Sequence, residues 1–536
     1  MLLRRYHPLV WAVTGLHVLA AVAFALLVPM FRAPDEAQHV DLIRQFRVEL
    51  GFEPPNRMIP QGADVSIANR SVADPEVLPR PPLLLRDAVP RPDRPSFADL
   101  AAPGQAGPDE NHLTHHPPTY YAAVAGATSF LAGLTPSGLW SWDREVLMYR
   151  LGSILLTAPL PLLAAEAAAA LALSRRAGAA AAAIILLSPQ ATSVAAAVNN
   201  DALVMLGASI AVVASMHHLR TGRHRSAWLA TAAAAVAALT KATAAPVLAW
   251  VVLVVVVAAW GRWRDPEARS SLVGTGVGAA VGATWYVRNL LLFGDAQPSG
   301  FRAPKAEGFQ ADLVGFVPAW ASRLSQSFWG LPARRTGVGL PAPVSHGLSA
   351  GVLGLSVLAL RDARRRPASV LLILLVVSQV LLLAQTNLRA HLRTGVYPAV
   401  QGRYLFALLI PLALLCVVGA RQLRTWWPGR VPMPSTTLVA LSVASVGAVL
   451  HLLLAASMLQ GFWGDDAAGL GDRLAAVVAW SPLPALMTHV VVWALVAATA
   501  VLVVGTLSRA VQELRASRHD GPGRQGPPVA AATADR

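Results

Sequence analysis

Long apolar stretches alternate with short, arginine-bearing polar segments along most of this chain. About twelve of these stretches have the length at which an α-helix crosses a bilayer. The pattern therefore predicts an all-α fold, a polytopic transmembrane helical bundle of about twelve spans. The first stretch follows Arg4 and Arg5 and is predicted to be an uncleaved signal anchor. The expected spans are residues 9–30, 146–173, 178–197, 202–219, 226–242, 244–260, 271–292, 346–361, 368–386, 402–420, 435–458 and 483–508.

Arginine clusters predict the orientation of the bundle, because Lys and Arg accumulate in cytoplasmic loops. The clusters alternate correctly between the two sides if the apolar stretch 120–134 is a surface helix on the outer side and not a span. Both termini are then cytoplasmic, and the long loops 31–118 and 293–345 face outward. The clusters expected in the cytoplasm are residues 175–176, 220–225, 262–269, 361–366 and 421–430.

The chain is expected to form one membrane domain, residues 1–510, followed by a disordered cytoplasmic tail, residues 511–536. Within the large first outer loop, residues 53–109 are rich in proline, which predicts irregular backbone with a short helix or two. Alanine-rich stretches at 164–172 and 227–238 predict close approach between helices.

Composition narrows the class of protein further. Of the 536 residues, 55% are hydrophobic and only 14% are charged, which excludes an ordinary soluble globule. The net charge of +15 does not indicate nucleic acid binding, because the arginines sit in short clusters between apolar runs and form no long stripe. Cys416 is the only cysteine, which rules out an intrachain disulfide and a cysteine-ligated zinc cluster.

The strongest candidate for chemistry lies just after the first span, in the sequence Pro34-Asp35-Glu36-Ala-Gln-His39. Pro34 suits the first turn of a helix, and the spacing would place His39 on the face of the two acids. Carboxylates at a lipid boundary carry a desolvation cost, so this motif predicts a proton acceptor or a metal site. The alternative is a solvated first turn in which the acids interact favourably with the helix dipole.

Two further polar motifs fall at the same, outer ends of the predicted spans. The first contains His115 and His116, then Tyr120 and Tyr121 at the start of the expected surface helix, and predicts contact with a metal or a sugar. Its alternative is an interfacial anchor, since tyrosines are common at membrane surfaces. The second motif is Asn199-Asn200-Asp201, which suits hydrogen bonding to a sugar and equally suits a turn and helix cap.

Three cations are expected near these motifs. Lys241, one of only two lysines, lies between two apolar runs and needs a partner, either a ligand, an internal acid or the interface. Arg288 and Asn289 close the seventh predicted span. Gln401, Gly402, Arg403 and Tyr404 open the tenth, and the glycine permits close approach of backbone to a ligand. Together the cations predict an anionic ligand such as a lipid phosphate.

These motifs occur in an order that resembles a bacterial membrane family known as domain of unknown function 2142, related to the C-type glycosyltransferase superfamily. The resemblance covers roughly residues 1–510, although the proline-rich insertion at 53–110 is longer than the equivalent loop of many relatives. Relatives include protein O-mannosyltransferases and aminoarabinose transferases, which use polyprenyl-phosphate sugars and keep a catalytic acid in the first outer loop. The resemblance implies that Asp35 is this acid, and that the protein resides in the bacterial plasma membrane with its active site on the outer face.

The residues and the resemblance lead to one functional hypothesis, a glycosyltransferase that moves a sugar from a polyprenyl phosphate to a cell-envelope glycan, lipid or protein. Asp35 is the expected general base, with Glu36 as second choice or metal ligand. Lys241, Arg288 and Arg403 would bind the phosphate. The reaction requires no nucleotide-binding loop, the sequence indicates no cofactor with certainty, and a bound divalent metal ion is an open alternative. The alternatives are a glycolipid flippase and a structural subunit of an envelope-polymer assembly.

Overall fold

Long helices dominate the computed structural model, which describes residues 5–49, 58–72, 89–135, 140–298, 311–330, 338–395, 400–426, 433–463 and 468–519. Within these ranges nine helices are long and apolar enough to cross a membrane. A tenth span is counted if the pair α8 (Arg175–Ile185) and α9 (Pro189–Ala195), bent by 70°, forms one broken span. The nine helices are α1 (Pro8–Leu27), α6 (Trp142–Thr157) with α7 (Leu160–Ala170), α10 (Asp201–Thr221), α12 (Ala245–Ala259) preceded by η6 (Ala242–Ala244), α15 (Ala342–Ala359), α16 (Arg366–Thr394), η7 (Gly402–Leu408) with α17 (Leu409–Leu423), α18 (Thr436–Phe462) and α20 (Ala485–His519).

The predicted all-helical, polytopic membrane architecture is therefore confirmed, at nine to ten candidate spans in the described part of the chain. Two more of the twelve expected spans correspond to α11 (His224–Ala238) and α13 (Pro266–Phe293). Helix α11 is only 15 residues long, and four glycines interrupt the apolar residues of α13. The total of twelve stays a prediction.

Small residues bring the central helices close together, as the alanine-rich stretches predicted. A Cβ atom added at Gly207 of α10 would lie 2.9 Å from the carbonyl oxygen of Ala233 in α11. A Cβ atom added at Gly178 of α8 would lie 3.4 Å from the carbonyl oxygen of Ala165 in α7. In a bilayer, where helix association gains little from the hydrophobic effect, such close backbone packing is a main source of stability.

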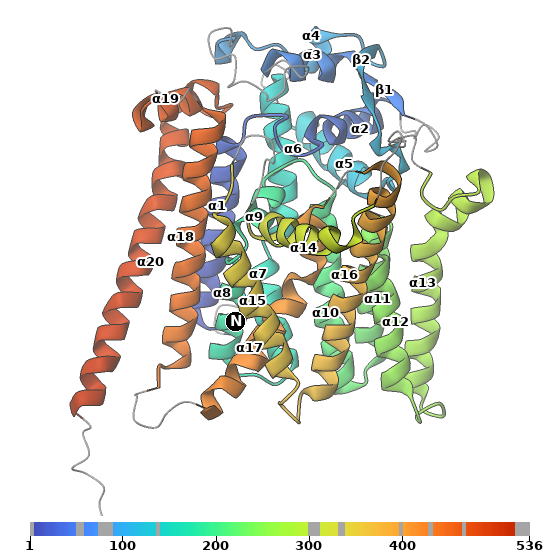
Figure 1. The fold of residues 1–536 in the computed structure, drawn as a ribbon. Helices are drawn as coiled ribbons and strands as arrows, with labels where there is room; N and C mark the ends of the chain where they lie inside the picture. The colour runs from blue at the N-terminus through green and yellow to red at the C-terminus, as the bar shows by residue number, and fades with distance from the viewer. Residues whose placement is uncertain are drawn as a thin grey trace, which may run out of the picture.

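Short elements cover one end of the bundle (Figure 1). They are α2 (Glu36–Glu49), β1 (Ile59–Gly62), α3 (Ala63–Val72), η3 (Arg91–Asp93), α4 (Phe97–Leu100), β2 (Ala106–Asn111), η4 (Leu113–His115), α5 (Thr119–Gly133) and α19 (Leu470–Trp480). Helix α5 packs on α2 at this end, and its position along the outer membrane surface stays a prediction. In the second predicted outer loop, α14 (Leu313–Trp329) lies across the axes of the long helices (Figure 1).

The antiparallel pair β1 and β2 was not predicted from the proline-rich loop, and it is the one departure from the all-α description among the described residues. Ile59 pairs with Asn111, and the register shifts between Pro60 and Gly62. The buried carboxylate of Asp41 on α2 holds the two strands together, because it accepts hydrogen bonds from the Gly62 N–H at 2.9 Å and the Asn111 side chain at 2.7 Å. This pairing depends on contacts between distant residues, which turn and composition signals do not contain.

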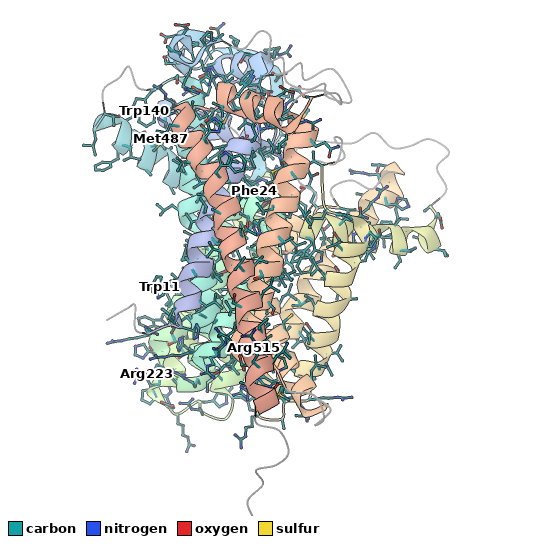
Figure 2. All side chains as sticks on the ribbon, turned by 90° about the vertical axis from the view of Figure 1, so that its left-hand side faces the viewer. Trp11, Phe24, Trp140, Arg223, Met487 and Arg515 are labelled. Carbon is teal, nitrogen blue, oxygen red and sulfur yellow. The ribbon has the colours of Figure 1, made fainter. Side chains whose placement is uncertain are left out.

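The opposite end of the bundle carries arginines. Figure 2 shows Arg223 and Arg515 at the far end from Trp140 and Met487. Arg220 and Arg365 donate to the carbonyl groups that end α7, at Ala169 and Leu171. Helix α20 continues to His519, so residues 511–519 of the predicted tail are helical, whereas 520–536 lie outside the described residues.

Candidate functional site

Asp35 lies in the short connection between α1, which ends at Leu27, and α2, which begins at Glu36. Its φ is +61°, in the left-handed region, and the φ of Phe31 in the same connection is +63°. Aspartate tolerates this region better than most residues, whereas phenylalanine does so at a cost. The reversal sends the neighbouring acids in different directions: the Asp35 side chain keeps 30% of its surface exposed, and the Glu36 side chain keeps none. The two acids and His39 therefore do not form the single face that the spacing predicted.

Glu36 is engaged in a buried pair with Arg150 of α6, which we call the buried clamp. Its two oxygens accept from Nε and Nη2 of Arg150 at 2.8 and 2.6 Å, and from the backbone N–H groups of Phe31 at 2.8 Å and Val198 at 3.0 Å. The remaining N–H groups of Arg150 donate to the carbonyl oxygens of Ala25, Val28 and Pro29. The clamp thus ties the end of α1 to α6 and to the loop before α10. Both side chains are fully buried, so such a pair is stable only because every donor and acceptor is used.

Asp35 instead belongs to an ion cluster that we define as Asp35, Asp201, Lys241 and Arg403. Asp35 accepts a hydrogen bond from Nη2 of Arg403, and Nε of Arg403 lies 3.6 Å from the second oxygen of Asp201. The other Asp201 oxygen accepts from Nζ of Lys241 at 2.6 Å. The cluster contains two acids and two cations from four separate segments, and of the four only Asp35 is partly exposed.

Local backbone explains how each member reaches the cluster. Asp201 is the first residue of α10, where an acid interacts favourably with the helix dipole. Lys241 occupies the extended break between α11 and η6, with φ −160°. Arg403 is the second residue of η7. The Tyr404 ring lies beside both cations, 5.0 Å from Nζ of Lys241 and 5.5 Å from Cζ of Arg403.

The cluster sets the ionisation state of Asp35. Burial opposes ionisation, but the adjacent Arg403 guanidinium outweighs it and holds the pKa of Asp35 well below its usual range. An ionised carboxylate with exposed surface can accept a proton. Asp201 has little exposed surface and already faces two cations, so it is less suited to that task.

The predicted histidines and tyrosines line the same region. Nδ1 of His39 is hydrogen-bonded to the Tyr121 hydroxyl at 2.9 Å, and the rings of His115 and His116 are 4.1 Å apart. The Tyr120 hydroxyl accepts a hydrogen bond from the N–H of Asn199 at 3.1 Å and is also hydrogen-bonded to the Ser153 hydroxyl.

Burial, with smaller contributions from the nearby cations, keeps these imidazoles neutral. It lowers the pKa of His115 to about 4 and holds the pKa values of His39 and His116 well below the usual range. For His39 the attraction of Asp35 acts in the opposite direction but does not prevail. At neutral pH these rings therefore offer hydrogen bonds without adding charge.

The Asn199-Asn200-Asp201 motif combines both predicted roles. Oδ1 of Asn199 accepts from the Asp201 N–H at 2.8 Å, which is the expected turn and cap. Asn200 is fully buried, and in the described ranges its amide atoms have no hydrogen-bond partner. A buried amide without partners is costly, so Asn200 is the member of the motif best suited to a polar ligand.

The structure adds detail at three of the predicted site residues, Lys241, Gly402 and Gln401. Lys241 has an internal acid, Asp201, as its partner, which was one of the alternatives. Gly402 brings backbone close to the backbone of Phe328 in α14, where an added Cβ would lie 2.2 Å from the Phe328 nitrogen, so its close approach is to protein. The side-chain oxygen of Gln401 is buried without a hydrogen-bond partner in the described ranges.

Arg288 lies outside the ion cluster. Its side chain is exposed on α13, stacks 5.2 Å from the Trp285 ring and donates to Oδ1 of Asn289 at 3.1 Å. Asn289 is buried and donates to the Ala296 carbonyl. No ion pair joins Arg288 to an acid among the residues that the structure describes. Of the three cations predicted to bind phosphate, Lys241 and Arg403 share one acid, Asp201, and Arg288 lies apart from them.

Two contributors escaped the sequence analysis, Arg150 and Gln379. Arg150 was counted inside the predicted span 146–173, where a charge within an apolar run is a signal for a buried partner. Gln379 interrupts an apolar run in the same way and reaches the site from α16. The described residues contain no group of three or more His, Cys, Asp or Glu side chains arranged to hold a metal ion. Metal dependence stays open.

Residues 113–291 match a family described as dolichyl-phosphate-mannose-protein mannosyltransferase. The matched segment is less than half of the 536-residue chain. It contains His115, Tyr120, Asp201 and Lys241, whereas Asp35 and Arg403 lie outside it. No protein of curated function matches the chain.

Two solved structures share a distant likeness with the chain. ArnT from Cupriavidus metallidurans, crystallised with undecaprenyl phosphate, has a TM-score of 0.45 at 15% sequence identity, over 90% of this chain and 77% of that one. The oligosaccharyltransferase of Archaeoglobus fulgidus, tethered to an acceptor peptide with an NVT sequon, has a TM-score of 0.40 at 11% identity, over 85% of this chain and 56% of that one. Neither likeness identifies a substrate for this chain.

Proposed function

We propose that this protein is an integral-membrane C-type glycosyltransferase, related to the bacterial domain of unknown function 2142 family, that uses a polyprenyl-phosphate sugar as donor. The ion cluster carries this proposal, because it joins a partly exposed, ionised acid to two cations at one end of a membrane bundle. The mannosyltransferase match at 113–291 supports the same reaction class. The acceptor is a hydroxyl-bearing glycan, lipid or protein of the cell envelope.

Asp35 is the proposed base. It removes the proton of the acceptor hydroxyl while the acceptor oxygen bonds to the anomeric carbon, and the bond from that carbon to the phosphate oxygen breaks. The departing polyprenyl phosphate takes the electron pair, and Lys241 and Arg403 stabilise its charge. Arg403 donates to Asp35, so an arriving phosphate competes with the Asp35 carboxylate for this guanidinium. This competition weakens the hold on the carboxylate and raises its basicity.

The surrounding residues have supporting roles in this proposal. Glu36, with all its hydrogen-bonding capacity taken by Arg150 and backbone, positions the connection that carries Asp35 and is a poorer base. Neutral imidazoles, amides and phenols suit sugar hydroxyls, which both donate and accept. The residues assigned to the sugar or its surroundings are His39, His115, His116, Tyr120, Tyr121, Asn199, Asn200, Gln401 and Tyr404, with Arg288 and Asn289 at the periphery.

The direct test places the purified full chain in vesicles with radiolabelled undecaprenyl-phosphate sugars and a hydroxyl acceptor. We expect time-dependent loss of label from the lipid and release of undecaprenyl phosphate. If the label crosses the bilayer while still attached to the lipid, the protein is a flippase. Full retention of label on the lipid with every donor and acceptor supplied would contradict the transferase proposal.

The proposed orientation places the ion cluster on the outer face and both termini in the cytoplasm. It can be tested in a Cys416→Ala background, because no other cysteine occurs in the chain. We expect Asn69→Cys and Arg334→Cys in intact cells to react with an impermeant thiol reagent, and Gly222→Cys to react only after lysis. Labelling of Gly222→Cys in sealed cells would reverse the orientation.

A further inference from the structure

Gln379 is a polar residue in the middle of α16, a helix that is otherwise suited to span the membrane. Its side chain is 1% exposed, and its amide nitrogen donates to two backbone carbonyl oxygens, those of Thr243 at 2.8 Å and Tyr404 at 2.9 Å. Both N–H groups of the amide are therefore used. Because carbonyl oxygens only accept, the two contacts also fix which end of the amide faces them.

The two carbonyl groups belong to the segments that carry the cations of the ion cluster. Thr243 is two residues after Lys241, at the break between α11 and α12, and Tyr404 directly follows Arg403 in η7. The Tyr404 ring lies beside both cations, at 5.0 Å from Lys241 and 5.5 Å from Arg403. One amide thus connects two segments that interrupt the regular helices. The cations of these segments, Lys241 and Arg403, both lie beside the Tyr404 ring and the Asp201 carboxylate.

The chemistry separates this arrangement from ordinary packing. Neither Lys241 nor Arg403 sits in the middle of an α-helix, so the regular helical ladder does not set the spacing between them. A buried amide in a membrane helix is costly unless its hydrogen bonds are made. Here the two N–H groups are satisfied by these two segments, whereas Oε1 has no hydrogen-bond partner in the described ranges. A nonpolar residue would pack against the same backbone without defining the distance between the segments.

We infer that Gln379 is a positioning residue, which holds Lys241 and Arg403 at the separation required to bind one phosphate group. This inference rests on the proposed function. Gln379 itself has no assigned contact with substrate and acts through the two backbone carbonyl groups.

The test compares Gln379→Met, which keeps length but cannot donate, with Trp250→Phe as a matched control. Trp250 on α12 donates its Nε1–H to the Leu371 carbonyl of α16 at 2.6 Å, and it is also buried. It therefore joins α16 to α12 by the same kind of bond as Gln379, away from the ion cluster. Each full-length variant is measured for binding of undecaprenyl phosphate and of uncharged undecaprenol, for amide hydrogen exchange in residues 240–245 and 401–406, and for thermal unfolding.

We expect Gln379→Met to weaken undecaprenyl phosphate binding about tenfold, in line with the loss of two neutral hydrogen bonds, with undecaprenol binding unchanged. Exchange should rise in both cation-bearing segments. Trp250→Phe should change neither phosphate binding nor hydrogen exchange in these segments, even if it lowers the unfolding temperature as much as Gln379→Met does. Partial recovery of phosphate binding in Gln379→His, which keeps one donor, would support the role further.

Other outcomes contradict the inference in distinguishable ways. If Trp250→Phe weakens phosphate binding as much as Gln379→Met, the amide is a helix-packing contact and nothing more. If Gln379→Met leaves undecaprenyl phosphate binding and hydrogen exchange unchanged while Lys241→Met abolishes that binding, Gln379 has no positioning role and the proposed function stands. If the unmodified protein binds undecaprenyl phosphate no better than undecaprenol, the phosphate site fails and this inference fails with it.

Discussion

Asp35 and Glu36 are neighbours in sequence and opposites in environment. Glu36 is fully buried and accepts hydrogen bonds from Arg150 and from two backbone N–H groups, so its oxygens have no capacity left. Asp35 is partly exposed, and the one side chain that donates to it within the described ranges is Arg403. The comparison shows how one dipeptide supplies two functions: the buried clamp gives rigidity, and the ion cluster keeps a carboxylate available for chemistry.

The largest expected effect comes from removing the acid of the ion cluster. Asp35→Asn keeps the shape and a hydrogen-bond acceptor for Arg403 but cannot take up a proton. We expect transfer to fall by ~10²–10⁴, the usual cost of a lost general base. The measurement is turnover with an identified donor in purified protein, with donor binding and thermal unfolding as controls. Near-normal turnover would reject Asp35 as the base.

Breaking the buried clamp should act on stability instead. Arg150→Met leaves the Glu36 carboxylate buried without its counter-charge, which typically costs ~3–5 kcal/mol. We expect a large drop in unfolding temperature, or failure to accumulate in the membrane. Glu36→Gln keeps some of the hydrogen bonds and should be milder. If Arg150→Met is as stable as the unmodified protein and only turnover is lost, the clamp has a direct role in the reaction.

The cations of the ion cluster should govern affinity for the lipid phosphate. Lys241→Met alone removes the cation that donates to the buried Asp201 carboxylate. We therefore combine it with Asp201→Asn, so that no buried charge is left without this partner. The double variant should fold and bind undecaprenyl phosphate roughly tenfold more weakly, since attraction at ~4 Å is worth several kcal/mol but is already shared with Asp201. Equal binding by the double variant and the unmodified protein would remove Lys241 from the site.

The contact between Asp35 and Arg403 predicts a change in pH dependence. Arg403 holds the pKa of Asp35 well below its usual range, against the effect of burial, so the base should stay ionised throughout the working range. Removing the cation in Arg403→Gln should raise this pKa. As the pH is lowered, the residual activity of Arg403→Gln should therefore disappear at a higher pH than the activity of the unmodified protein does. A profile of kcat/KM against pH measures the shift, and identical acidic limbs would contradict it.

The smallest effect is expected at Arg288, which is neither buried nor paired with an acid of the ion cluster. Its side chain is exposed, and it contacts Trp285 and Asn289 on its own helix. We expect Arg288→Gln to change phosphate affinity by less than about threefold, in keeping with the modest worth of an exposed charge. A loss as large as that of the Lys241 and Asp201 double variant would place Arg288 in the phosphate site after all.

The sequence alone determined much of the architecture. Apolar runs of membrane-spanning length predicted the helices, and the arginine clusters indicated which end should carry the outer elements. For that reason hydropathy was enough to assign Asp35, Asp201, Lys241 and Arg403 to one end of the bundle, since it fixes their positions relative to helix ends. The strand pair in the proline-rich loop could not be predicted from hydropathy. It depends on a hydrogen bond between Asp41 and Asn111, which lie in different segments of the chain.

Only the tertiary structure decided which charges pair. Glu36 lies 114 residues from Arg150, and Asp35 lies 368 residues from Arg403. Local spacing predicted one face for both acids, but the left-handed backbone at Asp35 separates them. Such choices depend on how helices approach one another within a few ångströms, and on the cost of any buried charge left without a partner. Hydropathy records that a residue is polar and near a helix end, whereas the partner and the remaining hydrogen-bonding capacity are properties of the folded chain.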